Sequence, residues 1–208
     1  MNTHAAVIYV VDNDDAFRDS LCWLLESAGH TVAAYADAES FLGALDPLQH
    51  GCLVLDIRMP GMSGLELQDE LKRHGNPLPI IFVTGHGDVP MAVSTVKKGA
   101  AEFIEKPFDD RALLGLVENA LTLDAGLRRE QARRMSVATR IATLTQRERE
   151  IMQYVVAGKM NKTIADELCI SIKTVEAHRA KVMLKMGVDS VAQLVQLALE
   201  AGMPCKTR

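Results

Sequence analysis

The sequence predicts an α/β protein with a doubly wound, five-stranded parallel sheet in strand order 2-1-3-4-5, followed by a small all-α helix-turn-helix domain. Short apolar runs alternate with segments of helical periodicity through the first 123 residues, which indicates a parallel sheet with helices on both faces. From residue 141 onward the periodicity is helical only. We therefore expect a first domain over residues 1–123, a helical linker over 124–140 and a helix-turn-helix domain over 141–208.

Five apolar runs are expected to form the strands of the sheet. The run at 52–56 ends in Asp56 and is followed by Pro60 and Gly61, which indicates a buried strand whose carboxyl end meets a turn. The other four predicted strands cover residues 7–11, 31–35, 79–84 and 102–105.

Helices are expected between these strands, with glycine or proline at their ends. Phe17, Leu21 and Leu25 recur at helical spacing after the first strand, and Gly29 ends this helix. The remaining helices are predicted over 38–45 before Pro47, over 64–74 before Gly75, around Met91, Val93 and Val96 before Gly99, and from Asp110 onward.

The segment from residue 111 to about 143 contains no proline, and its apolar residues recur among arginines. This composition predicts a charged, largely helical linker, and it fits either a stiff connection or a flexible tether. Thr145 and Glu148 then form a capping box for a helix that Gly158 ends. Three further helices are expected over 162–168, over 172–186 with Ser171 as cap, and over 191–202 with Ser190 as cap.

Charge is distributed unevenly along the chain. Residues 1–110 hold 7 Lys and Arg against 17 Asp and Glu, whereas residues 111–208 hold 16 against 10. An acidic first part favours a cation site, and a basic second part favours a polyanionic partner, although mixed solvated surfaces also produce milder asymmetry.

No targeting or membrane-spanning pattern is found in the sequence. The N-terminus lacks a basic start followed by a long apolar run, and 18 consecutive apolar residues occur nowhere. We therefore expect a cytoplasmic protein without membrane contact. The four cysteines are far apart and form neither a disulfide framework nor a CxxC motif, and three lie in apolar contexts that suit buried thiols.

Polar residues stand at several predicted strand ends, where an open parallel sheet forms its ligand sites. Asp12, Asn13 and Asp14 follow the first strand, and Asp56 ends the neighbouring third strand. Asp56 taken alone fits a helix cap or a turn as well as a site, and Asp14 is also a candidate N-cap.

Two more strand ends add a hydroxyl and an ammonium group to the same edge. Thr84 ends the fourth strand and Lys106 follows the fifth, although a strand end and a solvated lysine would explain each residue separately. Crowded carboxylates favour a hard cation such as Mg²⁺. Together these residues predict a phosphoryl acceptor, with Asp56 as nucleophile, Lys106 and the metal balancing charge, and Thr84 bonding a phosphate oxygen.

The segments 11–14, 56–64, 84–92 and 106–108 resemble the receiver domain of two-component response regulators, and the run 84–92 resembles the FixJ branch in particular. The resemblance covers about residues 5–123. It implies that a cognate sensor histidine kinase phosphorylates Asp56. It also implies that Mg²⁺ is held by Asp12, Asn13, Asp56 and the backbone carbonyl of Arg58.

By the same resemblance, Lys106 precedes a cis proline at Pro107, and Thr84 and Phe103 form the pair that moves on phosphorylation. One residue departs from the family pattern, because Asn13 stands where a second aspartate is usual. Its amide oxygen carries no charge, so we expect phosphorylation to persist with a higher Mg²⁺ requirement. An alternative is a receiver that needs no phosphorylation for DNA binding.

The second and third helices of the basic domain are predicted to form a helix-turn-helix. On the third helix, Ile172, Val175, Val182 and Met186 are expected to form the buried stripe. This leaves an outward face that suits the major groove, although ordinary solvated residues would give the same pattern. The outward residues are Lys173, Thr174, Glu176, Ala177, Ala180 and Lys181.

The segments 144–148, 161–165 and 173–179 resemble the LuxR/NarL-type DNA-binding domain, over about residues 141–202. The resemblance implies binding to double-stranded promoter DNA, with Glu176 and Ala177 near bases. His178 is expected to be packed or to face phosphate. Contacts with the DNA backbone are implied for Lys162, Lys173, Thr174, Arg179 and Lys181.

The two resemblances together imply a transcription factor that is not an enzyme. Phosphorylation would promote homodimerisation through the fourth helix and fifth strand and release the DNA-binding domain, and RNA polymerase would be a further partner. The competing interpretation is a haloacid-dehalogenase-type phosphatase with Asp12 as nucleophile and Asp14 as acid/base. Asp15 replaces the usual Thr or Val of that motif, and a phosphatase leaves the helix-turn-helix unexplained.

Overall fold

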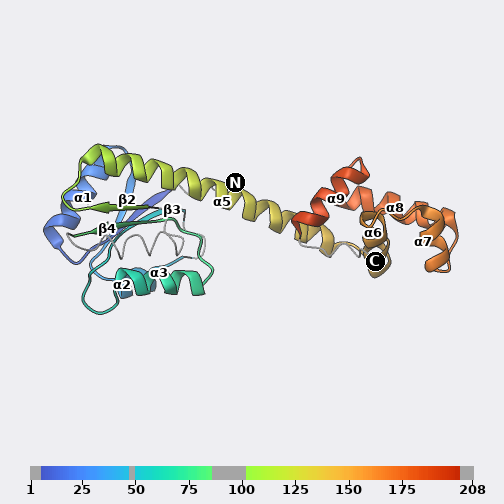
Figure 1. Ribbon diagram of the computed structural model, residues 1–208, viewed down its shortest axis with the longest axis horizontal. Coiled ribbons are helices and arrows are strands. Elements are labelled where there is room, and N and C mark those ends of the chain that lie inside the picture. The colour runs from blue at the N-terminus through green and yellow to red at the C-terminus, as the bar shows by residue number, and fades with distance from the viewer. Residues whose placement is uncertain (1–5, 47–49, 86–101, 202–208) are drawn as a thin grey trace. The chain divides into compact units, whose positions relative to one another are not determined.

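The computed structural model describes residues 6–46, 50–85 and 102–201 (Figure 1). The chain divides into two compact units, Met1–Arg128 and Arg129–Arg208, which are described separately. The predicted helix around Met91, Val93 and Val96 lies outside the described residues.

Within the described residues, the first unit contains a five-stranded parallel sheet in the order β2-β1-β3-β4-β5, which confirms the predicted fold class and strand order. All six residues of β3 are buried because neighbours cover both its edges and both its faces, and this explains its continuous apolar run. The strands are β1 (Val7–Val11), β2 (Thr31–Tyr35), β3 (Gly51–Asp56), β4 (Ile80–Thr84) and β5 (Glu102–Glu105).

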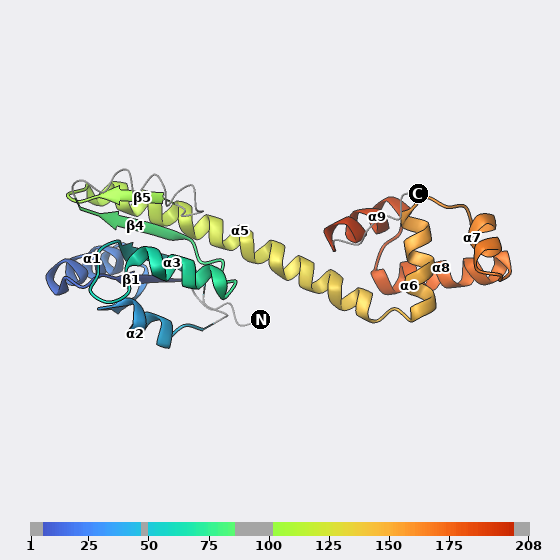
Figure 2. The same ribbon diagram turned by 60° about the horizontal axis from the view of Figure 1, so that its bottom comes forward.

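Helices cover both faces of this sheet (Figures 1 and 2). Helix α1 (Asp15–Ser27) and the first part of α5 (Asp110–Ala142) pack on one face, and α2 (Ala38–Gly43) and α3 (Gly64–Arg73) pack on the other. The two resulting cores are built around Leu21, Leu25, Leu113 and Val117 on one side and around Phe41, Leu67, Leu71 and Phe82 on the other.

A buried carboxylate attaches α5 to the start of β3. Asp124 is 3% exposed, and its Oδ2 accepts a hydrogen bond of 3.1 Å from the backbone N–H of Gly51. Its Oδ1 accepts a bond of 2.8 Å from Nε of Arg128, one helical turn further on. Gly51 has φ +133°, and a Cβ there would lie 1.8 Å from the carbonyl oxygen of Val7, so the strand start requires glycine.

In the second unit, the described residues form helices joined by short turns around one core. Val137 of α5 packs with Ile151, Val175 and Val182 at its centre. The helices after α5 are α6 (Gln146–Val156), α7 (Asn161–Glu167), α8 (Ile172–Met186) and α9 (Val191–Glu200). The predicted caps are present, because the side chains of Asp14, Thr145, Ser171 and Ser190 accept hydrogen bonds from the first turns of α1, α6, α8 and α9.

One core prediction is wrong. Val175, Val182 and Met186 are buried on α8 as expected, but the side chain of Ile172 is 46% exposed. Ile172 is the first residue of α8 and lies about 60° around the helix from Val175, so it stands at the edge of the buried stripe.

The cysteines also differ in their surroundings. Cys52 is buried and Cys22 is half-buried, whereas Cys169 is exposed in the turn before α8. Among the described helices, none is by itself long and apolar enough to cross a membrane, and only α8 and α9 taken together, bent by 59°, reach the required length and composition.

Candidate functional site

The register of the sheet places two aspartates side by side at its carboxyl edge. Val11 of β1 pairs with Leu55 of β3, so the next residues along these strands are Asp12 and Asp56. Both are buried, with 2% and 9% of their surface exposed. Two carboxylates so close together repel each other unless a cation lies between them.

Lys106 supplies that cation from the end of β5. Its ammonium Nζ lies 2.9 Å from Oδ2 of Asp12 and 3.1 Å from Oδ1 of Asp56. The backbone N–H of Lys106 donates to the carbonyl oxygen of Thr84 at 2.8 Å, which holds the lysine against the neighbouring strand end. The structure therefore brings together three residues that the sequence places at separate strand ends.

Helix α1 contributes two residues to this arrangement that the sequence reasoning did not assign to the site. The ammonium of Lys106 lies 3.8 Å from the centre of the Phe17 ring, a cation–π contact that shields it from water. Nη1 of Arg18 donates to the carbonyl oxygen of Asp12 at 2.7 Å. Phe17 and Arg18 follow Asp12 closely in the sequence, and this closeness is the one sequence signal that connects them to the site.

Asp14 connects the carboxylate pair to α1 through two hydrogen bonds. Its backbone N–H donates to Oδ1 of Asp12 at 2.8 Å, while its own side chain accepts from the backbone N–H of Phe17 at 3.1 Å. Asp14 therefore acts as the N-cap of α1.

The electrostatics of Asp56 follow from its burial. Burial raises the pKa of Asp56 above the ordinary value of 3.8, Lys106 opposes the rise, and Asp12 adds to it. Oδ2 of Asp56 also accepts a hydrogen bond of 2.9 Å from the backbone N–H of Arg58, which favours the ionised form. A buried, ionised carboxylate with a lysine against one oxygen is suited to nucleophilic attack on phosphorus.

The residues at this edge are also suited to a hard divalent cation. Mg²⁺ binds proteins through one or two carboxylates and keeps several waters, so Asp12 and Asp56 provide enough protein ligands. Asn13 is exposed next to them and offers an amide oxygen. Among the described residues no three His, Cys, Asp or Glu side chains form a group that could hold a metal ion.

The remaining predicted residues of the first unit lie around this edge. Thr84 is buried, and its hydroxyl donates to the carbonyl oxygen of Gly85 at 3.2 Å. Phe103 is half-buried and lies beside Phe82 of β4. Phe82 and Thr84 are two residues apart on β4, so their side chains point to the same face of the sheet. The peptide bond between Lys106 and Pro107 is cis, as the resemblance implies.

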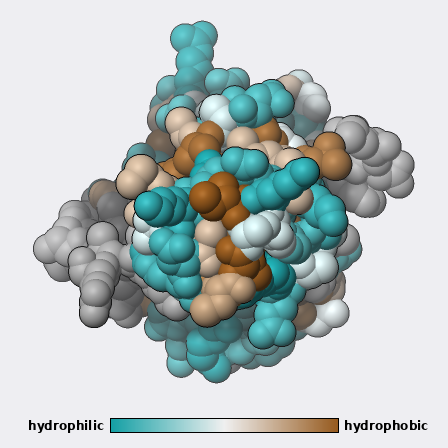
Figure 3. All heavy atoms as spheres, turned by 90° about the vertical axis from the view of Figure 1, so that its right-hand side faces the viewer, coloured by the Kyte–Doolittle hydropathy of each residue, from teal (hydrophilic) through white to brown (hydrophobic). Residues whose placement is uncertain are grey.

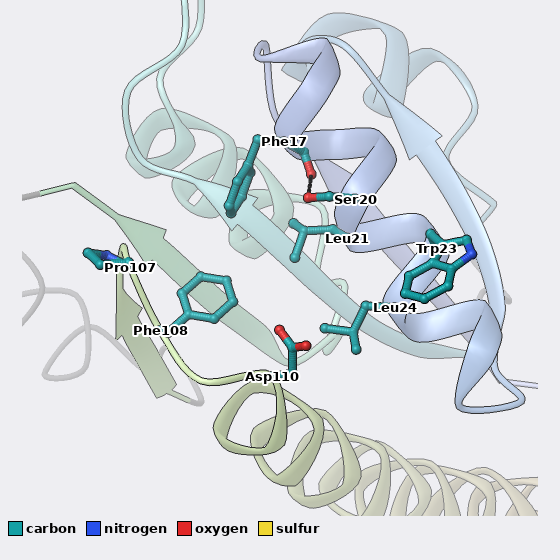
Figure 4. A pocket seen from close by; sticks show the side chains of 8 residues that line it. All are labelled: Phe17, Ser20, Leu21, Trp23, Leu24, Pro107, Phe108 and Asp110. Atoms are coloured by element: carbon teal, nitrogen blue, oxygen red, sulfur yellow. Dashed lines mark hydrogen bonds between the residues drawn. The ribbon is translucent and has the colours of Figure 1, made fainter.

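A hollow lies next to the acidic site, between α1 and the segment that leads into α5 (Figure 4). Its volume is about 320 Å³, and Trp23 on its rim is 73% exposed. Phe17 lines the hollow and also covers Lys106, so one ring belongs to both places. The other lining residues are Ser20, Leu21, Leu24, Pro107, Phe108 and Asp110.

In the second unit, most of the predicted DNA-contacting residues are exposed. Arg179 is the exception, since it is half-buried and its Nη1 donates to Oδ1 of Asn161 at 2.5 Å, which links α8 to α7. His178 is likewise half-buried. The exposed residues are Lys162 on α7 and Lys173, Thr174, Glu176, Ala177 and Lys181 on α8.

Two protein families match this chain. Residues 8–118 match the response regulator receiver domain, and residues 142–198 match the luxR family of bacterial regulatory proteins. The chain is 47% identical over 196 residues to the transcriptional regulatory protein FixJ of Bradyrhizobium diazoefficiens, covering 94% of this chain and 96% of that protein. It is 50% identical over 195 residues to FixJ of Azorhizobium caulinodans, covering 94% and 92%.

Solved structures of response regulators are also similar to this chain. The response regulator StyR has a TM-score of 0.84 and 44% identity, covering 94% of this chain and 99% of that chain. Full-length FixJ from B. japonicum has a TM-score of 0.59 and 47% identity, covering 96% and 98%.

Proposed function

This chain belongs to the response regulators that join a receiver domain to a LuxR-family DNA-binding domain, and we propose that phosphorylation of Asp56 by a sensor histidine kinase controls its binding to promoter DNA. The observation that carries the proposal is the contact of Lys106 with both buried carboxylates. The relatives are transcriptional regulators rather than enzymes. In the phosphatase alternative Asp14 would be the acid/base, whereas here its Oδ1 caps α1 by accepting from the backbone N–H of Phe17.

In the proposed reaction, an oxygen of Asp56 forms a bond to phosphorus while the bond between phosphorus and the donor breaks. Lys106 neutralises part of the added charge, and the Thr84 hydroxyl exchanges its bond to Gly85 for one to a phosphoryl oxygen. Receiver domains generally bind Mg²⁺ in their acidic pocket. Here Asp12, Asn13, Asp56 and the Arg58 carbonyl would hold the ion, which neutralises charge on the phosphoryl group.

Incubation of the full chain with acetyl phosphate and Mg²⁺ tests this assignment. The intact mass should rise by one phosphoryl group, and Asp56→Asn should abolish the rise. Asp19→Asn is the matched control, since Asp19 is an exposed carboxylate of α1. Labelling that persists in Asp56→Asn, or that disappears in Asp19→Asn as well, contradicts the proposal.

We further propose that the hollow beside the acidic site receives the kinase. An exposed apolar patch marks an interaction site, and this one adjoins the acceptor through Phe17 and Pro107. Trp23→Ala should therefore slow phosphoryl transfer from the kinase and leave labelling by acetyl phosphate unchanged. An equal effect on both donors would show that Trp23 supports the fold of the unit rather than docking.

Phosphorylation is proposed to promote homodimerisation, which would place two DNA-binding units on paired half-sites and present them to RNA polymerase. Phosphorylation replaces a carboxylate by a group with more negative charge and more acceptor oxygens, next to Thr84 and Lys106. Light scattering should show a dimer after treatment with acetyl phosphate. Dimers that form equally in Asp56→Asn would remove phosphorylation from the mechanism.

A further inference from the structure

The first residue of α8 presents an apolar side chain to solvent on the surface proposed to meet DNA. Ile172 is 46% exposed and directly precedes Lys173, which is exposed as well. In the space-filling view of the α7 end of this unit, a few apolar side chains lie among hydrophilic ones (Figure 3).

The two hydroxyl side chains near Ile172 already have hydrogen-bond partners at the start of the helix. Oγ of Ser171 accepts from the backbone N–H of Thr174 at 3.1 Å, and the two hydroxyl groups lie 2.8 Å apart. This local capping uses hydroxyls that could otherwise bind a base edge. In this turn Ile172 and Lys173 are therefore the exposed side chains whose tips are not used in capping the helix.

The exposed surface of α8 forms two rows at helical spacing, and all six members are exposed. One row has a lysine at each end, and these two lysines are suited to phosphate contacts. The other combines an apolar, an acidic and a small side chain, which is suited to base edges rather than to phosphate. The first row is Lys173, Ala177 and Lys181, and the second is Ile172, Glu176 and Ala180.

We propose that Ile172 is a specificity-determining residue that contacts the 5-methyl group of a thymine in the major groove. The inference rests on the proposed DNA binding. Thymine is the base that presents a methyl group in that groove, and apolar side chains recognise it by contact. The branched Ile172 side chain has restricted rotation, so little conformational freedom is lost on binding.

The position of the thymine follows from the helix geometry. Ile172 and Glu176 are four residues apart, which is about 6 Å along the helix axis. Successive base pairs rise by about 3.4 Å, so a helix lying along the groove places the two side chains about two base pairs apart. Glu176 would accept a hydrogen bond from a cytosine amino group. A bound site should therefore contain a thymine about two pairs from a cytosine.

Replacement of thymine by deoxyuridine tests this contact, because it removes only the methyl group. The full chain, treated with acetyl phosphate and Mg²⁺, is first used to select duplexes from a random library. Each thymine of the selected duplex is then replaced in turn. At one position the wild type should lose about fourfold in affinity, the factor that burial of one CH₂-sized group provides.

The Ile172→Ala variant should bind the thymine and deoxyuridine duplexes equally at that position. Lys173→Gln should bind both more weakly and keep the fourfold difference. Leu184→Ala is the matched apolar control, because Leu184 is 82% exposed further along α8, and it should also keep the difference.

Ile172→Ala that keeps the wild-type difference at every thymine overturns the inference and leaves the proposed function intact. Wild-type protein whose affinity changes at none of the thymine replacements would also overturn the inference and leave the proposed function intact. If no duplex is selected, the proposed DNA binding fails, and the role of Ile172 fails with it.

Discussion

Replacing Lys106 with methionine tests whether this lysine is the counterion of the acidic site. Methionine keeps an unbranched apolar chain beside the Phe17 ring but removes the ammonium group. The carboxylates of Asp12 and Asp56 would then lie together, 2% and 9% exposed, without the cation that now lies 2.9 Å and 3.1 Å from them. We expect the receiver unit to be destabilised.

The magnitude follows from the burial of the three groups. Removing one partner of a buried ion pair costs about 3–5 kcal/mol, because the remaining charge stays buried without compensation. The side chain of Lys106 is 27% exposed, so water already screens part of the attraction. We therefore expect a loss of about 2–3 kcal/mol in the free energy of unfolding.

Urea unfolding in EDTA, followed by the fluorescence of Trp23, measures this loss. Trp23 is the one tryptophan of the chain and lies on α1, so its emission reports on the receiver unit. Adding Asp12→Asn to Lys106→Met should restore at least half of the lost stability, since a single carboxylate no longer needs the cation. Wild-type stability in Lys106→Met, or no recovery in the double variant, would refute the reasoning.

Three further predictions concern both units. Contacts with Lys185 and with the backbone N–H of Thr145 lower the pKa of Glu148 from 4.5 to about 2, so the stability it contributes is complete above pH 4.5 and is lost as the pH falls toward 2. Thermal melts should show this dependence for the wild type and a weaker one for Glu148→Gln, and equal slopes would contradict it. Asn13→Asp should lower the Mg²⁺ concentration needed for half-maximal phosphorylation, because a second charged ligand strengthens binding, and an unchanged titration would argue against position 13 as a ligand. Lys173→Gln should weaken binding to all duplexes and reduce the salt slope by about 1. Arg129→Gln makes the same charge change at an exposed position of α5 and should leave the salt slope unchanged. Equal salt slopes in Lys173→Gln and Arg129→Gln would exclude the phosphate contact of Lys173.

The alignment of strand ends explains why much of the acidic site could be predicted. In a parallel sheet every strand finishes at the same edge, so Asp12, Asp56 and Lys106 converge although 94 residues separate the first from the last. The helices could be predicted for a different reason, because periodicity and capping residues are local signals in the sequence.

Contacts that depend on packing were not predictable from local patterns. The sequence marks Phe17 as an apolar helix residue, and only the packing of α1 against the end of β5 places its ring over Lys106. Ile172 fits the apolar period of α8, but its side chain is 46% exposed although Ile170 and Val175 on either side of it pack in the core. The hydrogen bond from Gly51 to Asp124 spans 73 residues, and no local sequence pattern in either segment indicates it.

The Asp124 contact also limits how this receiver can be joined to other proteins. Leu113 packs on the sheet and Asp124 reaches the start of β3, so the spacing between them fixes the rotational phase of α5. Deleting one residue between them would turn the later part of the helix by about 100° and carry the carboxylate away from Gly51. A chimaera that borrows this receiver should therefore keep α5 intact through Arg128 and place its fusion joint beyond that residue.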